Sequence, residues 1–267
     1  MTNQKEKSHS IPMDHPRYKS LTYRHKIIEG MKNLIVAEAG LIAHGRGEAF
    51  DYIIGERTTE TAKKAIEAAI AAFLLADHPV ISVNGNVAAL IPEELVKFSQ
   101  VISAPLEINL FYRKEGRIEA IEKVLRQAGA QNLLGINESE MVEIEELSSN
   151  RRLVDPRGIK KADIVFVPLE DGDRTEALKK NGKKIITVDL NPISRTALWA
   201  DITIVDNIIR AVPLMIKITQ KFKKFPRDEL KSIIANFDNV KNIQASLDLI
   251  ISYIEEQKIE AFKGLDV

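Results

Sequence analysis

The stretch that decides the fold is ADIVFVPLEDGDRTEALKKNGKKIITVDLNPISRTA, residues 162–197. Its two runs of apolar, β-branched residues, 164–167 and 185–188, have the length and composition of buried strands. Residues 174–180, between them, are expected to form a short helix. Because parallel neighbours need a long connection, strand, helix and strand in this order predict a parallel crossover unit.

The sequence carries signals for both the beginning and the end of the expected helix 174–180. Asp173 stands at the N-cap position and Glu176 follows three residues later, as in a capping box. Asn181-Gly182 follows the helix, and glycine readily adopts the left-handed conformation that often ends one. These signals set the expected length of the crossover helix.

Polar side chains follow four of the predicted strands. They are Asn84 and Asn86, then Glu170, Asp171 and Asp173, then Asp189 and Asn191, and finally Asp206 and Asn207. A turn or a helix cap explains each cluster taken alone. Together they fall at the carboxyl ends of parallel strands, where open α/β sheets bind ligands, and so they predict one shared polar cleft.

Apolar periodicity predicts strands and helices in alternation along the rest of the chain. The expected strands are 80–83, 106–111, 132–136, 164–167, 185–188 and 202–205. The expected helices are 18–32, 60–76, 92–103, 118–128, 174–180, 207–222, 227–236 and 242–262. About six strands alternating with helices predict an α/β fold, a Rossmann-like three-layer αβα architecture with a mostly parallel sheet and helical N- and C-terminal segments.

We expect residues 1–267 to form a single α/β domain. Residues 1–13 are polar and expected to be flexible. Residues 137–161 are charged and poorly periodic, which predicts an exposed excursion, and residues 226–267 are expected to form a helical C-terminal extension.

The composition excludes several classes of function. The 38 basic and 38 acidic residues balance, which gives no support to nonspecific nucleic-acid or membrane binding. The chain has no cysteine, so disulfides, thiolate catalysis and cysteine-bound metals are excluded, and its five histidines lack HExxH spacing. Without an apolar leader or a run of about 20 apolar residues, the chain is expected to be cytoplasmic.

A glycine-rich stretch, residues 39–59, reads AGLIAHGRGEAFDYIIGERTT. Arg46 lies between two glycines, an arrangement suited to close contact with a phosphate. The stretch matches neither GxGxxG nor GxxxxGK[ST], and a structural turn explains the glycines about equally well. Histidine at position 44 is either a hydrogen-bonded structural residue or an acid–base group.

The expected cleft combines arginines with carboxylates. The candidate anion binders are Arg24, Arg46, Arg113 and Arg195, although Arg24 alone fits a solvated helix face. Asp171 and Asp173 are either helix caps or ligands for Mg²⁺. No Ser-His-Asp order or nucleophile elbow is visible. The residues alone therefore predict a nucleotide-dependent protein that acts on a phosphorylated small molecule.

Seven blocks between Ile11 and about Ala211 resemble the archaeal phosphopantothenate synthetases, the 4-phosphopantoate–β-alanine ligases. The blocks are IP-x-DHPRY-x-SL-x-YR, GLIAHGRGEAFDY-x-x-GE-x-T, PVISVNGN-x-AALIP, E-x-NLFYR, ADIVFVPLEDGDRTEAL, DLNPISRTA and ADITIVDNIIRA. The resemblance implies that ATP, 4-phosphopantoate and β-alanine give 4′-phosphopantothenate, AMP and diphosphate through an acyl adenylate, a step toward coenzyme A. It also implies a homodimer.

The resemblance places nucleotide contacts on Arg24, Arg46, Asp189, Leu190, Asn191, Arg195, Thr196, Asn207 and Ile208. Geometry alone suggests Asn84, Asn86 and Arg113 for 4-phosphopantoate and Asp171 and Asp173 for Mg²⁺. His44 is the candidate proton acceptor for the β-alanine ammonium group. The Ala-rich helix 60–76 or the C-terminal helices are the candidate dimer surfaces.

Two other classes of function compete with the ligase. A non-catalytic regulatory or scaffold protein that binds nucleotide would share the fold without turnover. A nicotinamide-dependent oxidoreductase would need a GxGxxG motif after a strand, and the sequence has none.

Overall fold

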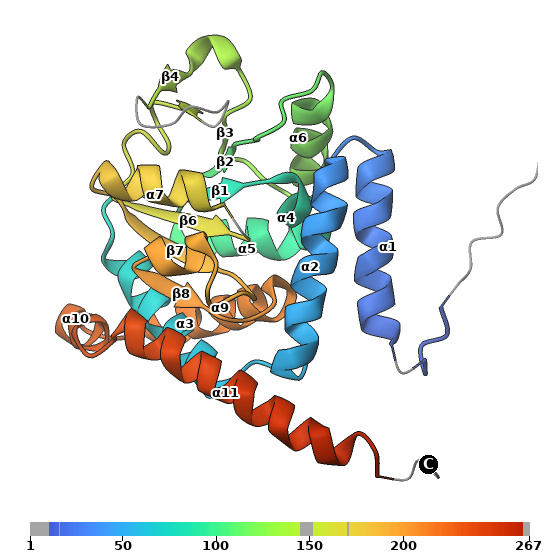
Figure 1. Cartoon of the computed structure of the whole chain (residues 1–267). Coiled ribbons are helices and arrows are strands. Elements are labelled where there is room, and N and C mark those ends of the chain that lie inside the picture. The colour runs from blue at the N-terminus through green and yellow to red at the C-terminus, as the bar shows by residue number, and fades with distance from the viewer. Residues whose placement is uncertain (1–10, 16, 145–151, 170, 264–267) are drawn as a thin grey trace, which may run out of the picture.

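The computed structural model describes residues 11–15, 17–144, 152–169 and 171–263. Its centre is a six-stranded parallel sheet with the strand order β3-β2-β1-β6-β7-β8 (Figure 1). The strands are β1 (Pro79–Val83), β2 (Leu106–Ile108), β3 (Leu133–Leu134), β6 (Ile164–Pro168), β7 (Lys184–Val188) and β8 (Ile202–Ile204). A separate antiparallel pair joins β4 (Val142–Glu143) to β5 (Leu153–Val154). The predicted α/β fold with a parallel sheet is confirmed.

Helices cover both faces of the sheet (Figure 1). The α-helices are α1 (Tyr18–Lys32), α2 (Glu38–Ile54), α3 (Glu60–Leu75), α4 (Gly85–Leu90), α5 (Pro92–Ile102), α6 (Arg117–Gln127), α7 (Gly172–Lys180), α8 (Arg195–Trp199), α9 (Ile208–Phe222), α10 (Arg227–Ala235) and α11 (Asn239–Glu260). Helices α3, α5 and α9 pack together on one face, and α7 packs on the other. None of these helices combines the length and apolar character needed to cross a bilayer.

The core on the α3 side is built around three phenylalanines. Phe73 of α3, Phe98 of α5 and Phe166 of β6 meet edge to face, with ring centroids 5.6 to 6.0 Å apart. Each pair of this kind adds about 1 kcal/mol beyond its buried area. Strand β1 crosses the middle of the sheet, where Ile81 pairs with both β2 and β6. This core and the pairing of β1 with both neighbours fix the positions of the carboxyl ends of the central strands.

Residues 39–54 of the glycine-rich stretch lie in helix α2 and do not form a phosphate-binding loop. A Cβ atom at Gly40 would lie 2.3 Å from the Asn86 side-chain oxygen, so glycine lets α2 approach α4. A Cβ atom at Gly85 would lie 2.1 Å from the carbonyl oxygen of Ile35. Close packing of α4 against α2 and against the connection between α1 and α2, which a single sequence does not reveal, explains these two glycines.

Helix α7 begins earlier than the cap signal indicated. Asp171 occupies the N-cap position without a side-chain cap bond, and Asp173 lies inside the first turn. Glu176 pairs with Lys180 and Arg195 and forms no capping box. The end was predicted correctly, since α7 stops at Lys180 and Gly182 has a φ angle of 74°.

The segment 137–161 is less exposed than expected. Its described residues include the fully buried Val154 and Ile159, which pack under the α7 face with Ile144. The predictions for residues 1–10 fall outside the described residues, as do those for 145–151 and 264–267. Helices α10 and α11 form the C-terminal extension that the sequence predicted.

Candidate active site

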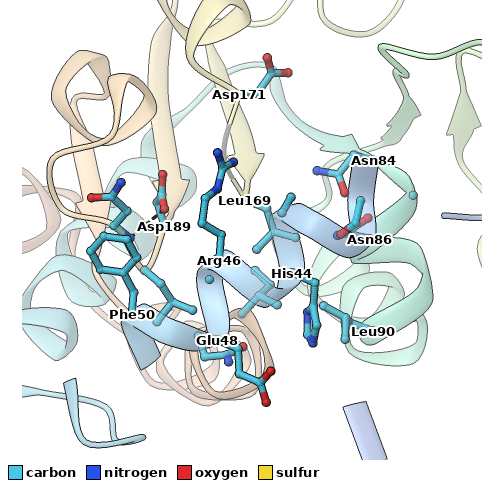
Figure 2. A pocket seen from close by; sticks show the side chains of 18 of the residues that line it. His44, Arg46, Glu48, Phe50, Asn84, Asn86, Leu90, Leu169, Asp171 and Asp189 are labelled. Carbon is cyan, nitrogen blue, oxygen red and sulfur yellow. Dashed lines mark hydrogen bonds between the residues drawn. The ribbon is translucent and has the colours of Figure 1, made fainter. Parts of the chain in front are cut away.

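A pocket of about 780 Å³ lies between α2 and the carboxyl edge of the sheet. His44, Arg46, Glu48 and Phe50 of α2 line it, and Figure 2 shows Arg46 and Phe50 extending toward Asp171 and Asp189, which follow strands. The strand-end residues that line it are Asn84, Asn86, Asp171, Asp173, Asp189, Asn191 and Asn207. The predicted shared cleft is therefore present, and its volume suits a ligand the size of a nucleotide with a small second molecule. Glu170 lies outside the described residues.

The turn after β7 is locked by its own side chains. Asp189 is buried and accepts hydrogen bonds from the Ser194 hydroxyl at 2.5 Å and the Asn191 backbone N–H at 2.9 Å. The Ser194 oxygen in turn caps α8 by accepting from the backbone N–H of Ala197 at 2.9 Å. This turn presents Leu190 to the pocket on a fixed backbone.

Carboxylates hold Arg195 at the start of α7. Its guanidinium pairs with Asp173 at 2.5 Å and with Glu176 at 2.6 Å. The backbone N–H of Asp171 donates to the Thr196 hydroxyl oxygen at 2.7 Å, which ties α7 to α8. Among the described residues no group of three or more His, Cys, Asp or Glu side chains is arranged to hold a metal. Of the described carboxylates here, Asp171 and Asp173 line the pocket, and Asp173 would have to leave Arg195 before it could bind a cation.

His44 is half-buried in the pocket wall. Burial lowers the pKa of its imidazole, and nearby Arg24 lowers it further, while Glu48 raises it. Burial therefore favours the neutral imidazole, the form that can accept a proton.

Asp51 of α2 is buried and joins the beginning of α9. Its carboxylate accepts from the Arg210 guanidinium at 2.5 and 3.1 Å and from the Asn207 side-chain amide at 2.8 Å. Arg210 also pairs with the buried Asp206 at 2.7 Å. The Asp206 carboxylate accepts from the Thr58 hydroxyl at 2.6 Å.

Comparison with known proteins gives the family. A family model described as phosphopantothenate/pantothenate synthetase matches residues 61–253. This chain belongs to that family. It is 57% identical to the 4-phosphopantoate–β-alanine ligase of Thermococcus kodakarensis over 235 residues, 88% of this chain and 89% of the relative. It is 48% identical to the ligase of the same name from Methanosarcina mazei over 250 residues, 94% of this chain and 98% of the relative.

Three residues that were predicted to bind the nucleotide or 4-phosphopantoate do not line the pocket. Arg24 forms a double hydrogen bond with Glu48, at 2.7 and 2.8 Å, on the side of α2 toward α1. Arg113 is buried behind the wall, where it donates to the sulfur of Met141 at 3.1 Å. Thr196 is also fully buried. Arg24 and Thr196 nevertheless each contact a lining residue, Glu48 and Asp171 respectively.

Asn84 and Asn86, two of the predicted substrate-binding residues, line the pocket and also hold its walls in place through hydrogen bonds. Asn84 caps α4 through its side-chain oxygen and donates from its amide to the Pro168 carbonyl at 3.0 Å. The Asn86 amide donates to the Gly40 carbonyl at 2.8 Å and so fixes the beginning of α2. A tight turn was one prediction for residues 84–86, but helix α4 begins there.

Sequence reasoning missed several lining residues of this synthetase. Arg117 is buried, and its guanidinium donates to the carbonyls of Leu34, Ile35 and Tyr112. It therefore organises the wall that holds Phe111. The other missed lining residues include Lys19, Ser20, Tyr23, Phe50, Asp51 and Arg210. An arginine in an amphipathic helix gives no sequence signal for such a role.

Proposed function

We propose that the chain is an ATP-dependent ligase that joins 4-phosphopantoate to β-alanine and releases AMP and diphosphate. The observation that carries the proposal is the pocket, in which strand-end polar groups face the arginine-bearing helix α2. Relatives that bear this ligase name match nearly the whole chain. The reaction belongs to coenzyme A biosynthesis and would run in the cytoplasm, where ATP is available.

We assign the two substrates to two groups of lining residues, since Figure 2 shows Asp189 and Asn84 on different sides of Arg46. One part is bounded by Asp189, Leu190, Asn191, Arg195, Asn207 and Ile208, and we expect the nucleotide there. The other part is bounded by Asn84, Asn86, Phe111 and Tyr112, and we expect 4-phosphopantoate there. Arg46 of α2 lines the pocket, and Figure 2 shows its guanidinium directed toward Asp171. This position suits a cation that stabilises charge on transferring phosphate oxygens.

The proposed chemistry has two steps. A carboxylate oxygen of 4-phosphopantoate attacks the α-phosphorus of ATP, and the bond to the leaving diphosphate breaks. The β-alanine amine then attacks the acyl carbon of the adenylate, and AMP leaves with the former carboxylate oxygen. The protein contributes positioning and charge stabilisation. We assign the proton of the attacking ammonium group to the neutral His44 imidazole.

We propose that Mg²⁺ accompanies ATP at Asp171 and Asp173. Magnesium commonly uses one or two carboxylates together with substrate phosphates, and two carboxylates line this part of the pocket. Bound there, the ion would neutralise phosphate charge. Arg195, which pairs with Asp173, would then be released toward the nucleotide.

We further propose a homodimer, as the family resemblance implies. Helix α11 leaves Ile251, Ile254 and Ile259 exposed at 60, 46 and 64%, an apolar surface suited to a second copy. Sedimentation of the purified chain would test this, and a monomer across micromolar concentrations would exclude it.

Diphosphate release tests the ligase. With ATP, Mg²⁺ and β-alanine, we expect release that requires 4-phosphopantoate. Binding of ATP without any such release would instead make the chain a regulatory or scaffold protein.

A further inference from the structure

Helix α2 contributes many of the residues that line the pocket and is tied by hydrogen bonds, toward each end, to residues that follow strands of the sheet. At its beginning, the Asn86 amide donates to the Gly40 carbonyl at 2.8 Å. Toward its end, Asp51 accepts from Arg210 and Asn207 at the β8–α9 turn. The helix segment between these ties carries His44, Arg46 and Phe50, which line the pocket.

The second tie is a compact charged cluster, which we name the Arg210 clamp. It consists of Asp51, Thr58, Asp206, Asn207 and Arg210. The Arg210 Nε–H donates to Asp206 at 2.9 Å while both of its terminal nitrogens donate to Asp51. Asp51, at 5% exposure, and Asp206, at 1%, are both buried. One planar guanidinium therefore joins two buried carboxylates from separate elements, a geometry that lysine cannot reproduce.

The clamp also fixes a residue of the nucleotide part of the pocket. The Asn207 side-chain oxygen caps α9 by accepting from the backbone N–H of Ile209, and its amide donates to Asp51. Both the oxygen and the nitrogen of the Asn207 side-chain amide are thus hydrogen-bonded. A change in Asp51 alters the position of α2 and of Asn207 together.

We propose that Arg210 and Asp51 are positioning residues that set the separation between α2 and the β8–α9 turn and thereby shape the nucleotide part of the pocket. This rests on the proposed function, since that part is assigned to ATP. The wall of the phosphopantoate part is held by Arg117, whose guanidinium donates to the carbonyls of Leu34, Ile35 and Tyr112, all outside the clamp. Breaking the clamp therefore acts on one substrate far more than on the other.

The kinetic test compares Arg210→Lys and Asp51→Asn with wild type by diphosphate release. The KM for ATP is expected to rise about tenfold, the equivalent of about 1.4 kcal/mol, while the KM for 4-phosphopantoate stays within about twofold. Arg126→Lys is the matched control, because Arg126 pairs with Glu122 on the exposed surface of α6. An unchanged KM for ATP, or an equal rise in both KM values, overturns the proposal.

Amide hydrogen exchange and calorimetry test the clamp independently of turnover. Without ligand, Arg210→Lys should speed exchange in residues 47–54 of α2, and Arg126→Lys should not. ATP titrated into the folded proteins should bind about tenfold more weakly to Arg210→Lys than to wild type. Unaltered exchange, or unaltered ATP affinity, overturns the proposal. A wild-type chain that binds ATP without releasing diphosphate refutes only the ligase, and these two measurements still decide the clamp.

Discussion

Glu107, a carboxyl group inside β2, makes the stability of the fold depend on pH. Its side chain is fully buried and accepts from the backbone N–H groups of Asp155 at 3.0 Å and Ile159 at 2.6 Å. Burial raises its pKa to about 7. The two hydrogen bonds and the nearby Arg174 lower the pKa, but the effect of burial is larger. The nearby Asp155 raises the pKa further. We predict that Glu107→Gln removes a pH dependence that wild type possesses.

The magnitude follows from the shift in pKa. The ordinary value is 4.5 and the folded value is about 7. Because the folded state favours the protonated carboxyl, the contribution of Glu107 to stability is full below pH 4.5 and is lost as pH rises through 7. At 1.36 kcal/mol for each pKa unit, the loss amounts to about 3 kcal/mol.

Urea unfolding at pH 4.5, 6 and 8 measures this effect. The free energy of unfolding of wild type minus that of Glu107→Gln should fall by about 3 kcal/mol from the lowest to the highest pH. Subtracting the two curves removes the contributions of all other titrating groups. Parallel curves across this range would refute the assignment of a raised pKa to Glu107.

Three further predictions concern the pocket and its frame. Arg46→Ala should lower kcat/KM about a hundredfold with an unchanged melting temperature, because Arg46 is exposed on α2 and alanine favours helix; activity lost only through unfolding would contradict it. His44→Gln should slow amide formation while preserving exchange of labelled diphosphate into ATP, and equal loss of both would exclude His44 as the proton acceptor. Gly85→Ala should destabilise the fold by about 3 kcal/mol in thermal unfolding, since its Cβ atom would lie 2.1 Å from the Ile35 carbonyl. Gly45→Ala, where a Cβ atom meets nothing within 4 Å, should leave stability unchanged or raised, and the opposite order would refute this account of the glycines.

Local patterns were enough to predict the sheet and its ligand edge. Short runs of β-branched residues predict buried strands. When the strands are parallel, the polar residues that follow them lie at the same edge of the sheet. The helix cap at Asn207 was likewise predictable from the sequence, because a cap acts within a few residues. These features depend on short-range chemistry or on the sheet alone.

Contacts between distant segments were not predictable in this way. The glycines of α2 looked like a loop because the close approach of α4, which requires Gly40, leaves no local mark. Asp51 and Arg210 are 159 positions apart, and nothing near either residue signals their pairing. Arg24 was placed at the site by the family resemblance and Arg113 by its type and position in the chain. Arg24 instead pairs with Glu48, Arg113 contacts Met141, and neither lines the pocket.

The most direct test of the account follows one labelled oxygen atom through the reaction. 4-Phosphopantoate carrying an isotopically labelled carboxylate would be incubated with the wild-type chain, ATP, Mg²⁺ and β-alanine, and the products analysed by mass spectrometry. An acyl adenylate requires one labelled oxygen in AMP for each amide formed. Label in inorganic phosphate together with formation of ADP would contradict the account.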